Sequence, residues 1–160
     1  VGHAYRDGEC LDATNDDWYC YYLQGALDKD IIPKEMIENC NVTKVTKTLA
    51  EATDDKKAVT TDVNVYTGKF DGDKPITREE MAAIAVRCKN YKMRRLTDWD
   101  NERRYPIFSF KDSDEIDEKY ISDVVEAYNL NYIDGMEDGR FAPKENLTRA
   151  QAAVVMNNLK

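Results

Sequence analysis

The chain has 160 residues, of which 42% are apolar and 34% charged, and this balance indicates a folded protein and excludes a disordered one. Its net charge of −8 argues against a protein that binds nucleic acid, because no basic stripe offsets the acidic residues. No apolar run approaches the roughly 20 residues that a membrane-spanning helix requires, so membrane insertion is not expected.

The sequence opens without a basic and apolar leader, so we expect that any secretion signal has been removed or lies outside it. The cysteines lack the close paired spacing of a zinc site, and a single histidine, His3, excludes a His-rich metal site. Two disulfides are favoured if the protein is extracellular, and buried thiols are the alternative. The four residues concerned are Cys10, Cys20, Cys40 and Cys88.

The N-terminal segment predicts one amphipathic helix followed by an insertion. Asp16 or Asp17 begins the helix, and apolar residues then recur at three- and four-residue steps from Trp18 to Leu27. Residues 34–65 are acidic and rich in threonine, which indicates an insertion. Within it, residues 41–52 predict a short helix capped by Asn41 or Thr43.

Residues 66–77 predict a glycine-containing loop, and residues 78–95 predict a long helix. Residues 96–107 are polar enough to form a connector. A further amphipathic helix is expected from Ser113 or Asp114 to about Tyr128, and the turn-rich stretch "IDGMEDGRFAP" follows it. Thr148 begins the last predicted helix, so the order of helix, glycine-rich loop and helix occurs twice.

Both second helices begin with the signature of a capping box. In Thr77 and Glu80, and again in Thr148 and Gln151, a threonine precedes Glu or Gln by three residues. Stability does not explain the arginine that follows each threonine, because a cation in the first turn opposes the positive end of the helix dipole. Arg78 and Arg149 therefore point to a function that needs a cation at a helix N-terminus.

The repeated pattern resembles the S-layer homology module of bacterial surface proteins. Seven residues separate phenylalanine from threonine in both copies, Phe70 to Thr77 and Phe141 to Thr148. The N-terminal copy keeps Trp18 and Ile31-Ile32 but lacks the first glycine of the loop. The C-terminal copy matches the family pattern at Phe110, Asp112, Gly135, Asp138, Gly139, Phe141, Pro143, Leu147, Thr148, Arg149 and Ala150, with Tyr120 in place of the usual tryptophan.

The resemblance implies an all-α fold of tandem helix–loop–helix modules. An interrupted module is expected over residues 1–95, with the insertion at about 34–65, and a second module over residues 108–160. Members of the family usually carry three modules around a pseudo-threefold axis. The sequence leaves open whether a third lobe forms here.

The resemblance also implies noncovalent, non-enzymatic anchoring of a secreted protein to the bacterial cell surface, without a cofactor. The usual ligand is an anionic, often pyruvylated, secondary cell-wall polysaccharide, or peptidoglycan. A guanidinium holds a carboxylate through two parallel hydrogen bonds, which suits this ligand. The residues expected to contact the glycan are Arg149, Arg78, Asp112, Asp7, Trp18, Tyr120, Gly135 and Gly139.

Several of these residues also have a structural interpretation. Trp18 and Tyr120 lie on the apolar stripes of their helices, which favours burial over sugar stacking. Asp7 and Asp112 equally suit a helix cap or an internal pair with arginine, and Gly139 suits a turn. For Arg149 and Arg78, an intramolecular salt bridge is the alternative to ligand contact. The sequence alone leaves these alternatives open.

Three other functions compete with glycan binding. Residues 69–80 resemble part of a calcium-binding loop, but Lys69 and Lys74 occupy a ligand position and the required glycine position. Paired carboxylates suit glycan hydrolysis, although no nucleophilic triad or phosphate-binding loop accompanies them. The main alternative is a surface module that kept the fold and binds a protein partner.

Overall fold

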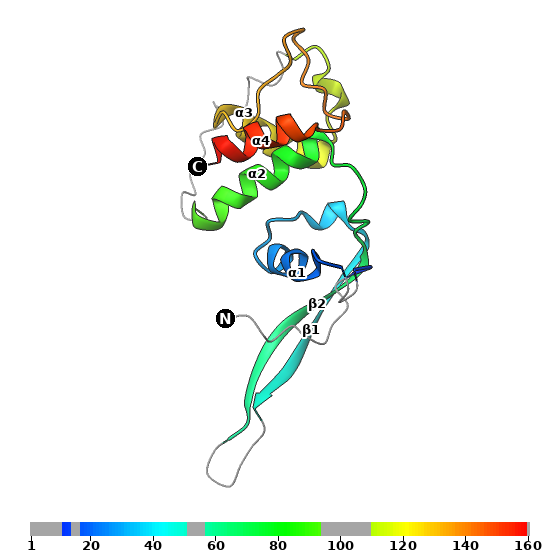
Figure 1. Cartoon of the computed structure of the whole chain (residues 1–160), viewed down its shortest axis with the longest axis vertical. Coiled ribbons are helices and arrows are strands. Elements are labelled where there is room, and N and C mark those ends of the chain that lie inside the picture. Colours follow the sequence, from blue (N-terminus) through cyan, green and yellow to red (C-terminus); the bar gives the residue numbers. More distant parts are fainter. Residues whose placement is uncertain (1–10, 14–16, 51–56, 94–109, 160) are drawn as a thin grey trace. The chain divides into compact units, whose positions relative to one another are not determined.

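The computed structural model describes residues 11–13, 17–50, 57–93 and 110–159 (Figure 1). The chain divides into two compact units, one of Val1–Asp28 with Lys34–Gly72 and one of Lys29–Pro33 with Asp73–Lys160. Asp7 and the expected connector over residues 96–107 lie outside the described residues. Each unit is described by itself.

The first unit combines one helix with a long β-hairpin. Helix α1, Cys20–Asp28, buries Cys20, Leu23 and Leu27, which lie on one face because they are three and four residues apart. A short 3-10 helix, Lys34–Met36, leads into the hairpin. The hydroxyl of Tyr66, on the second strand, donates to the carbonyl of Leu27 at 3.2 Å and ties α1 to the hairpin.

Strands β1, Glu38–Ala50, and β2, Val59–Lys69, pair antiparallel and form a ribbon that extends well beyond α1 (Figure 1). Cross-strand neighbours include Val45 with Val63 and Thr48 with Thr60, and β-branched residues of this kind favour a pleated strand. The all-α prediction is therefore wrong, and so is the short helix at residues 41–52. The chain is mixed α/β, since helices accompany this two-stranded sheet.

The second unit is helical in its described residues. Helix α2, Arg78–Met93, packs against α3, Ile121–Asn129, and both lie where the sequence predicts helices. Two 3-10 helices, Ser113–Glu115 and Glu118–Tyr120, precede α3, and α4, Arg149–Asn158, ends the described chain. The core between these elements includes Ala82, Val86, Tyr120, Val124 and Phe141.

Candidate functional site

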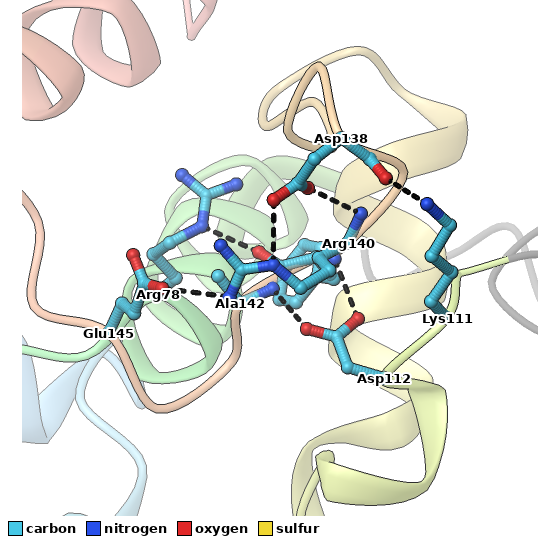
Figure 2. Close-up of polar contacts among 8 residues, drawn as sticks. Arg78, Lys111, Asp112, Asp138, Arg140, Ala142 and Glu145 are labelled. Carbon is cyan, nitrogen blue, oxygen red and sulfur yellow. Dashed lines mark hydrogen bonds and ion pairs between the residues drawn. The ribbon is translucent and has the colours of Figure 1, made fainter.

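A buried carboxylate holds the glycine-rich loop of the second unit in place. Asp112 accepts hydrogen bonds from the backbone amides of Phe141 and Ala142, both at 2.8 Å (Figure 2). Ala142 has a φ of +59°, a left-handed conformation that L-residues rarely adopt, so the carboxylate compensates for a strained backbone. Asp112 thus binds the protein's own loop with both of its oxygens.

The first unit repeats this geometry with a different aspartate. Asp12 accepts from the amides of Phe70 at 2.6 Å and Asp71 at 2.9 Å, and Asp71 has a φ of +56°. Burial raises the pKa of Asp12, but the two amides and the charge of Lys69 outweigh it and lower that pKa below its ordinary value. Asp12 is the structural counterpart of Asp112 among the described residues, and Asp7 lies outside them.

Arg78, at the start of α2, is an internal residue with only 4% of its surface exposed. Its Nε donates to the carbonyl of Phe141 at 2.7 Å (Figure 2), and its Nη2 donates to the carbonyl of Asp134 at 2.6 Å. The guanidinium also lies 5.2 Å from the centroid of the Phe141 ring. Burial lowers the pKa of Arg78, while the charges of Glu145, Asp112 and Asp134 act in the opposite direction.

The backbone amides at the start of α2 are also occupied. Those of Arg78 and Glu79 donate to the carbonyls of Glu145 and Pro143, at 3.0 and 3.2 Å. Thr77 receives a contact from the amide of Glu80, 3.4 Å away, and its own amide donates to Glu80 Oε2 at 2.9 Å. These donors are the ones that an anion at a helix N-terminus requires, and here the protein itself uses them.

A charged network also joins the start of α2 to Lys144 and Asp117. Glu79 is buried, and its two carboxylate oxygens accept from the Lys144 ammonium at 2.6 Å and the Asp117 amide at 3.1 Å. Lys144 also reaches the Asp117 carboxylate at 2.5 Å. The lysine therefore neutralises a buried carboxylate that would otherwise lack a counter-charge.

Arg149 has the same place in α4 but different surroundings. Thr148 and Gln151 form the predicted capping box, with the Thr148 amide 2.9 Å from Gln151 Oε1 and the Gln151 amide 3.2 Å from Thr148 Oγ1. Arg149 and Ala150 are exposed. Within the described residues, no hydrogen bond or ion pair holds the Arg149 guanidinium, and the amides of these two residues have no acceptor. One guanidinium and two amides are thus open to solvent.

The two predicted aromatic contacts differ in exposure. Tyr120 is buried under α3, whereas Trp18 is 82% exposed and lies beside Tyr19 and Tyr22, with ring centroids 5.9 and 6.4 Å away. Trp18 therefore presents a free ring surface of the kind on which sugars stack, and Tyr120 does not. Sequence periodicity favoured burial of both residues.

The two predicted glycines have structural roles in the loop. A Cβ on Gly135 would lie 2.3 Å from Cε1 of Phe110, so only glycine allows this ring to pack. Gly139 has a φ of +87°, and Gly68, its counterpart before Phe70, has a φ of +137°. The Gly-x-Phe repeat thus places a glycine of positive φ two residues before the aspartate-bound phenylalanine in both copies, within β2 in the first and in a loop in the second.

A surface network fixes the outer side of the loop. Arg140 pairs with Asp138 at 2.8 Å and with Glu145 at 3.0 Å, and these two carboxylates raise the pKa of Arg140 (Figure 2). Lys111 donates to the carbonyl of Asp138 at 2.5 Å. This loop is therefore rigid, but its cations are already paired.

Among the described residues, the cysteines and the remaining site types add no further binding chemistry. Cys20, Cys40 and Cys88 are thiols, buried, half-buried and exposed in that order, and Cys10 lies outside the described residues. Among the described residues, no group of three metal-ligating side chains comes together. None of the described helices has the length and apolar character of a membrane span.

Comparison with known proteins identifies the second copy. The model of the S-layer homology domain matches residues 109–153. The chain is 37% identical over 102 residues to an endoglucanase of Bacillus sp. (strain KSM-635). The aligned region covers 61% of this chain and 10% of the enzyme. The chain is also 39% identical over 84 residues to an amylopullulanase of Thermoanaerobacterium thermosulfurigenes, covering 52% of this chain and 4% of that enzyme.

The chain therefore spans a tenth or less of the length of these two relatives. No solved structure matches it. The matched segment contains the Asp112-anchored loop, the capping box of α4 and Arg149. The predicted family is confirmed: residues 109–153 are an S-layer homology domain, a cell-wall anchoring module rather than a catalytic one.

Proposed function

We propose that this chain anchors a secreted protein to the bacterial cell surface by binding an anionic, often pyruvylated, polysaccharide of the cell wall. We further propose two modules, an interrupted one before residue 96 and the S-layer homology domain over residues 108–160, joined by a connector at 96–107. Peptidoglycan is the alternative wall polymer. The chain would contribute binding only, and any catalytic activity of a longer protein would lie outside it.

Arg149 is the observation that carries this proposal. An acidic chain repels an anionic polymer at long range, so it needs a local cation that is free to bind. The exposed guanidinium offers two parallel N–H donors for a sugar carboxylate, and the unoccupied amides of α4 lie at the same helix end. Arg78 lacks this freedom, because Phe141 and Asp134 hold its guanidinium.

Exposed Trp18 supports a second contact with sugar in the first unit. An indole ring buries a large apolar area at one face, and a pyranose ring presents C–H groups that suit it. Asp112, Gly135 and Gly139 then support the site indirectly, since they fix the loop that precedes α4.

Sedimentation with purified wall sacculi tests the proposal. Untreated sacculi should retain the protein, and sacculi stripped of their secondary polysaccharide should not. Arg149→Lys should weaken retention at least about tenfold, because one bidentate charged contact is worth about 1.5–3 kcal/mol. The matched control is Arg140→Lys, whose guanidinium is already paired with Asp138 and Glu145 and which should change retention little.

Two results would overturn the proposal. Equal retention on stripped and untreated sacculi would favour a protein partner or peptidoglycan. Unchanged retention of Arg149→Lys, together with a lower free energy of unfolding, would make Arg149 a structural residue. Unfolding by urea, measured on the same samples, separates loss of binding from loss of fold.

A further inference from the structure

Helices α2 and α4 carry the same motif, yet only α2 is covered. Counted from the arginine, Ala83 of α2 corresponds to Val154 of α4. Ala83 has no exposed surface, whereas Val154 is 58% exposed, and the neighbouring Met156 is exposed too. The stripe of Arg149, Ala150, Val154 and Asn157 is thus open to solvent on α4, although its counterpart on α2 is an interface.

The segment that covers α2 defines what would fit α4. A loop held by an aspartate, with Phe141 at its start, supplies carbonyls to Arg78 and to the first amides of the helix. Helix α3 then packs along α2, and Asp123 pairs with Arg87 at 3.6 Å. The covering surface therefore consists of an anchored loop and the helix that belongs to the same module.

The first unit contains a second surface of this kind, and it is exposed. The amides of Phe70 and Asp71 bind Asp12 as those of Phe141 and Ala142 bind Asp112, with a similar left-handed φ at the second residue. Gly72 and Asp73, which follow, are exposed. The loop conformation that receives Arg78 in the second unit is therefore preformed after Phe70, where Tyr19 lies against Gly72 and residues 71–73 are exposed.

Helix α1 supplies the corresponding apolar contact. Helices α1 and α3 are both nine residues long, and alignment of their first residues places Tyr22 opposite Asp123, the α3 residue that faces α2. Tyr22 is 74% exposed. An exposed aromatic side chain thus occupies the position from which an apolar stripe such as Val154 would be covered.

Charge favours pairing of this loop with α4 over pairing with α2. In the existing interface, Glu79 of α2 is matched by Lys144 of the loop at 2.6 Å. The counterpart of Lys144 is Asp73, and the counterpart of Glu79 is Ala150, so the loop that begins at Phe70 would bring Asp73 to a carboxylate on α2 but to an uncharged residue on α4. Lys74 corresponds to Glu145, whose side chain faces Arg140 rather than the helix.

We propose that the open stripe of α4 binds the first module of a second copy of this chain, through loop residues 70–73 and Tyr22. Each copy has one such stripe and one such loop surface, so association is head to tail and forms rings or open chains. Docking would enclose Arg149 as the loop of the second unit encloses Arg78. Self-association and wall binding would then compete for one arginine, although neither proposal depends on the other.

Analytical ultracentrifugation of the whole chain, without glycan, tests this proposal. The mean mass should rise above that of the monomer with increasing concentration. Val154→Glu should weaken association at least about tenfold, because it removes buried apolar area and places a charge in the interface. Tyr22→Glu should do the same from the other surface, and Val59→Glu on β2, where the side chain is 53% exposed, is the matched control without effect.

Mixing the two variants distinguishes head-to-tail association from a symmetric contact. Val154→Glu keeps an intact loop surface and Tyr22→Glu keeps an intact α4 stripe, so the mixture should form one-to-one dimers that grow no further. A monomeric wild type at the highest soluble concentration would overturn the proposal. Association that survives Val154→Glu, or a mixture that stays monomeric, would overturn it as well. Val154→Glu should still bind sacculi, so failure of this proposal leaves wall anchoring testable.

Discussion

The Arg78 guanidinium donates to the Phe141 carbonyl at 2.7 Å and lies over the ring of the same residue. One residue therefore receives both a charged hydrogen bond and a cation–π contact from a side chain 63 positions earlier. Phe141 itself is held by Asp112 through its amide. The loop, the buried Arg78 and Asp112 therefore form one connected network at the start of α2.

We predict that Arg78→Lys destabilises the protein and that Arg149→Lys does not. A lysine cannot reach the carbonyls of Phe141 and Asp134 together, so at least one buried contact is lost at a cost of about 2–3 kcal/mol. The exposed Arg149 should contribute less than about 0.5 kcal/mol. Urea unfolding measures both free energies, and equal values for the two variants would contradict the structural difference between the helices.

We predict that Asp112→Asn lowers stability by about 2–4 kcal/mol. The carboxylate accepts from two backbone amides, and an asparagine keeps one acceptor but turns an N–H₂ group toward the other amide. Asp12→Asn in the first unit should cost less, because that carboxylate is more exposed. Thermal unfolding of the two variants, compared under one buffer condition, checks the order.

We predict opposite effects for two Gly→Ala substitutions. Gly135→Ala forces a methyl group against the Phe110 ring and should cost about 1–3 kcal/mol. Gly25→Ala lies inside α1, where a Cβ meets nothing within 4 Å, and should stabilise by about 0.5–1 kcal/mol. A stabilising Gly135→Ala would mean that Phe110 packs elsewhere.

Local patterns predicted the helices and their caps but not the hairpin. The stripes of α3 and the Thr148–Gln151 box depend on residues close in sequence, so the sequence alone identified them. Strand β1 depends on pairing with β2, and its Val and Thr residues were taken for a capped helix. The available signal was composition, since five of the residues 42–48 are the β-branched Val or Thr.

The candidate site shows the same limit. Arg78 and Arg149 follow threonine in identical motifs, and only the segment packed against each helix decides that one is buried and the other exposed. Asp12 was missed because Cys10 stands where the C-terminal copy has Phe110, so the pattern of an aromatic residue two positions before aspartate is absent there. A short motif also does not predict the left-handed conformation of Asp71, the residue after Phe70.

We predict that Thr148→Ala opens α4 locally. Loss of the hydroxyl leaves the Gln151 amide without its acceptor and should cost about 1 kcal/mol of helix stability. Because α4 packs with little of its surface, the change should appear as faster amide exchange in residues 149–155 rather than as global unfolding. Thr77→Ala, at the well-packed α2, is the comparison and should change the amide exchange of that helix much less.

We predict that the Asp117–Lys144 pair gives the protein a stability plateau between acid and alkaline limits. A hydrogen bond from Lys144 lowers the pKa of Asp117, so its contribution is present above the ordinary value of 3.8 and is lost as pH falls through the lower folded value. Burial lowers the pKa of Lys144, but Asp117 and Glu79 outweigh it and raise that pKa above 10.5. Its contribution is therefore lost only as pH rises through the higher folded value.

Lys144→Met should make the stability of the protein depend less on pH at both the acid and the alkaline end. Urea midpoints measured from about pH 3 to pH 11 should fall more gently than in the wild type at each end. A variant that changes the midpoint equally at all pH values would show that Lys144 acts through packing of its aliphatic stem. Lys34→Met, at an exposed lysine that forms no ion pair among the described residues, is the matched control and should leave both limits unchanged.

The hairpin joins its module through a closed base. Glu38 pairs with Lys69 where the two strands meet the rest of the unit, and the next residue, Phe70, is already bound by Asp12. Fifty-eight positions separate Asp12 from Phe70, against 29 between Asp112 and Phe141, yet the anchored turn has the same form. The chain between the aspartate and the phenylalanine is thus twice as long in the first unit, yet the two bound amides and the left-handed residue keep the same arrangement, so the hairpin adds length without altering the turn that closes it.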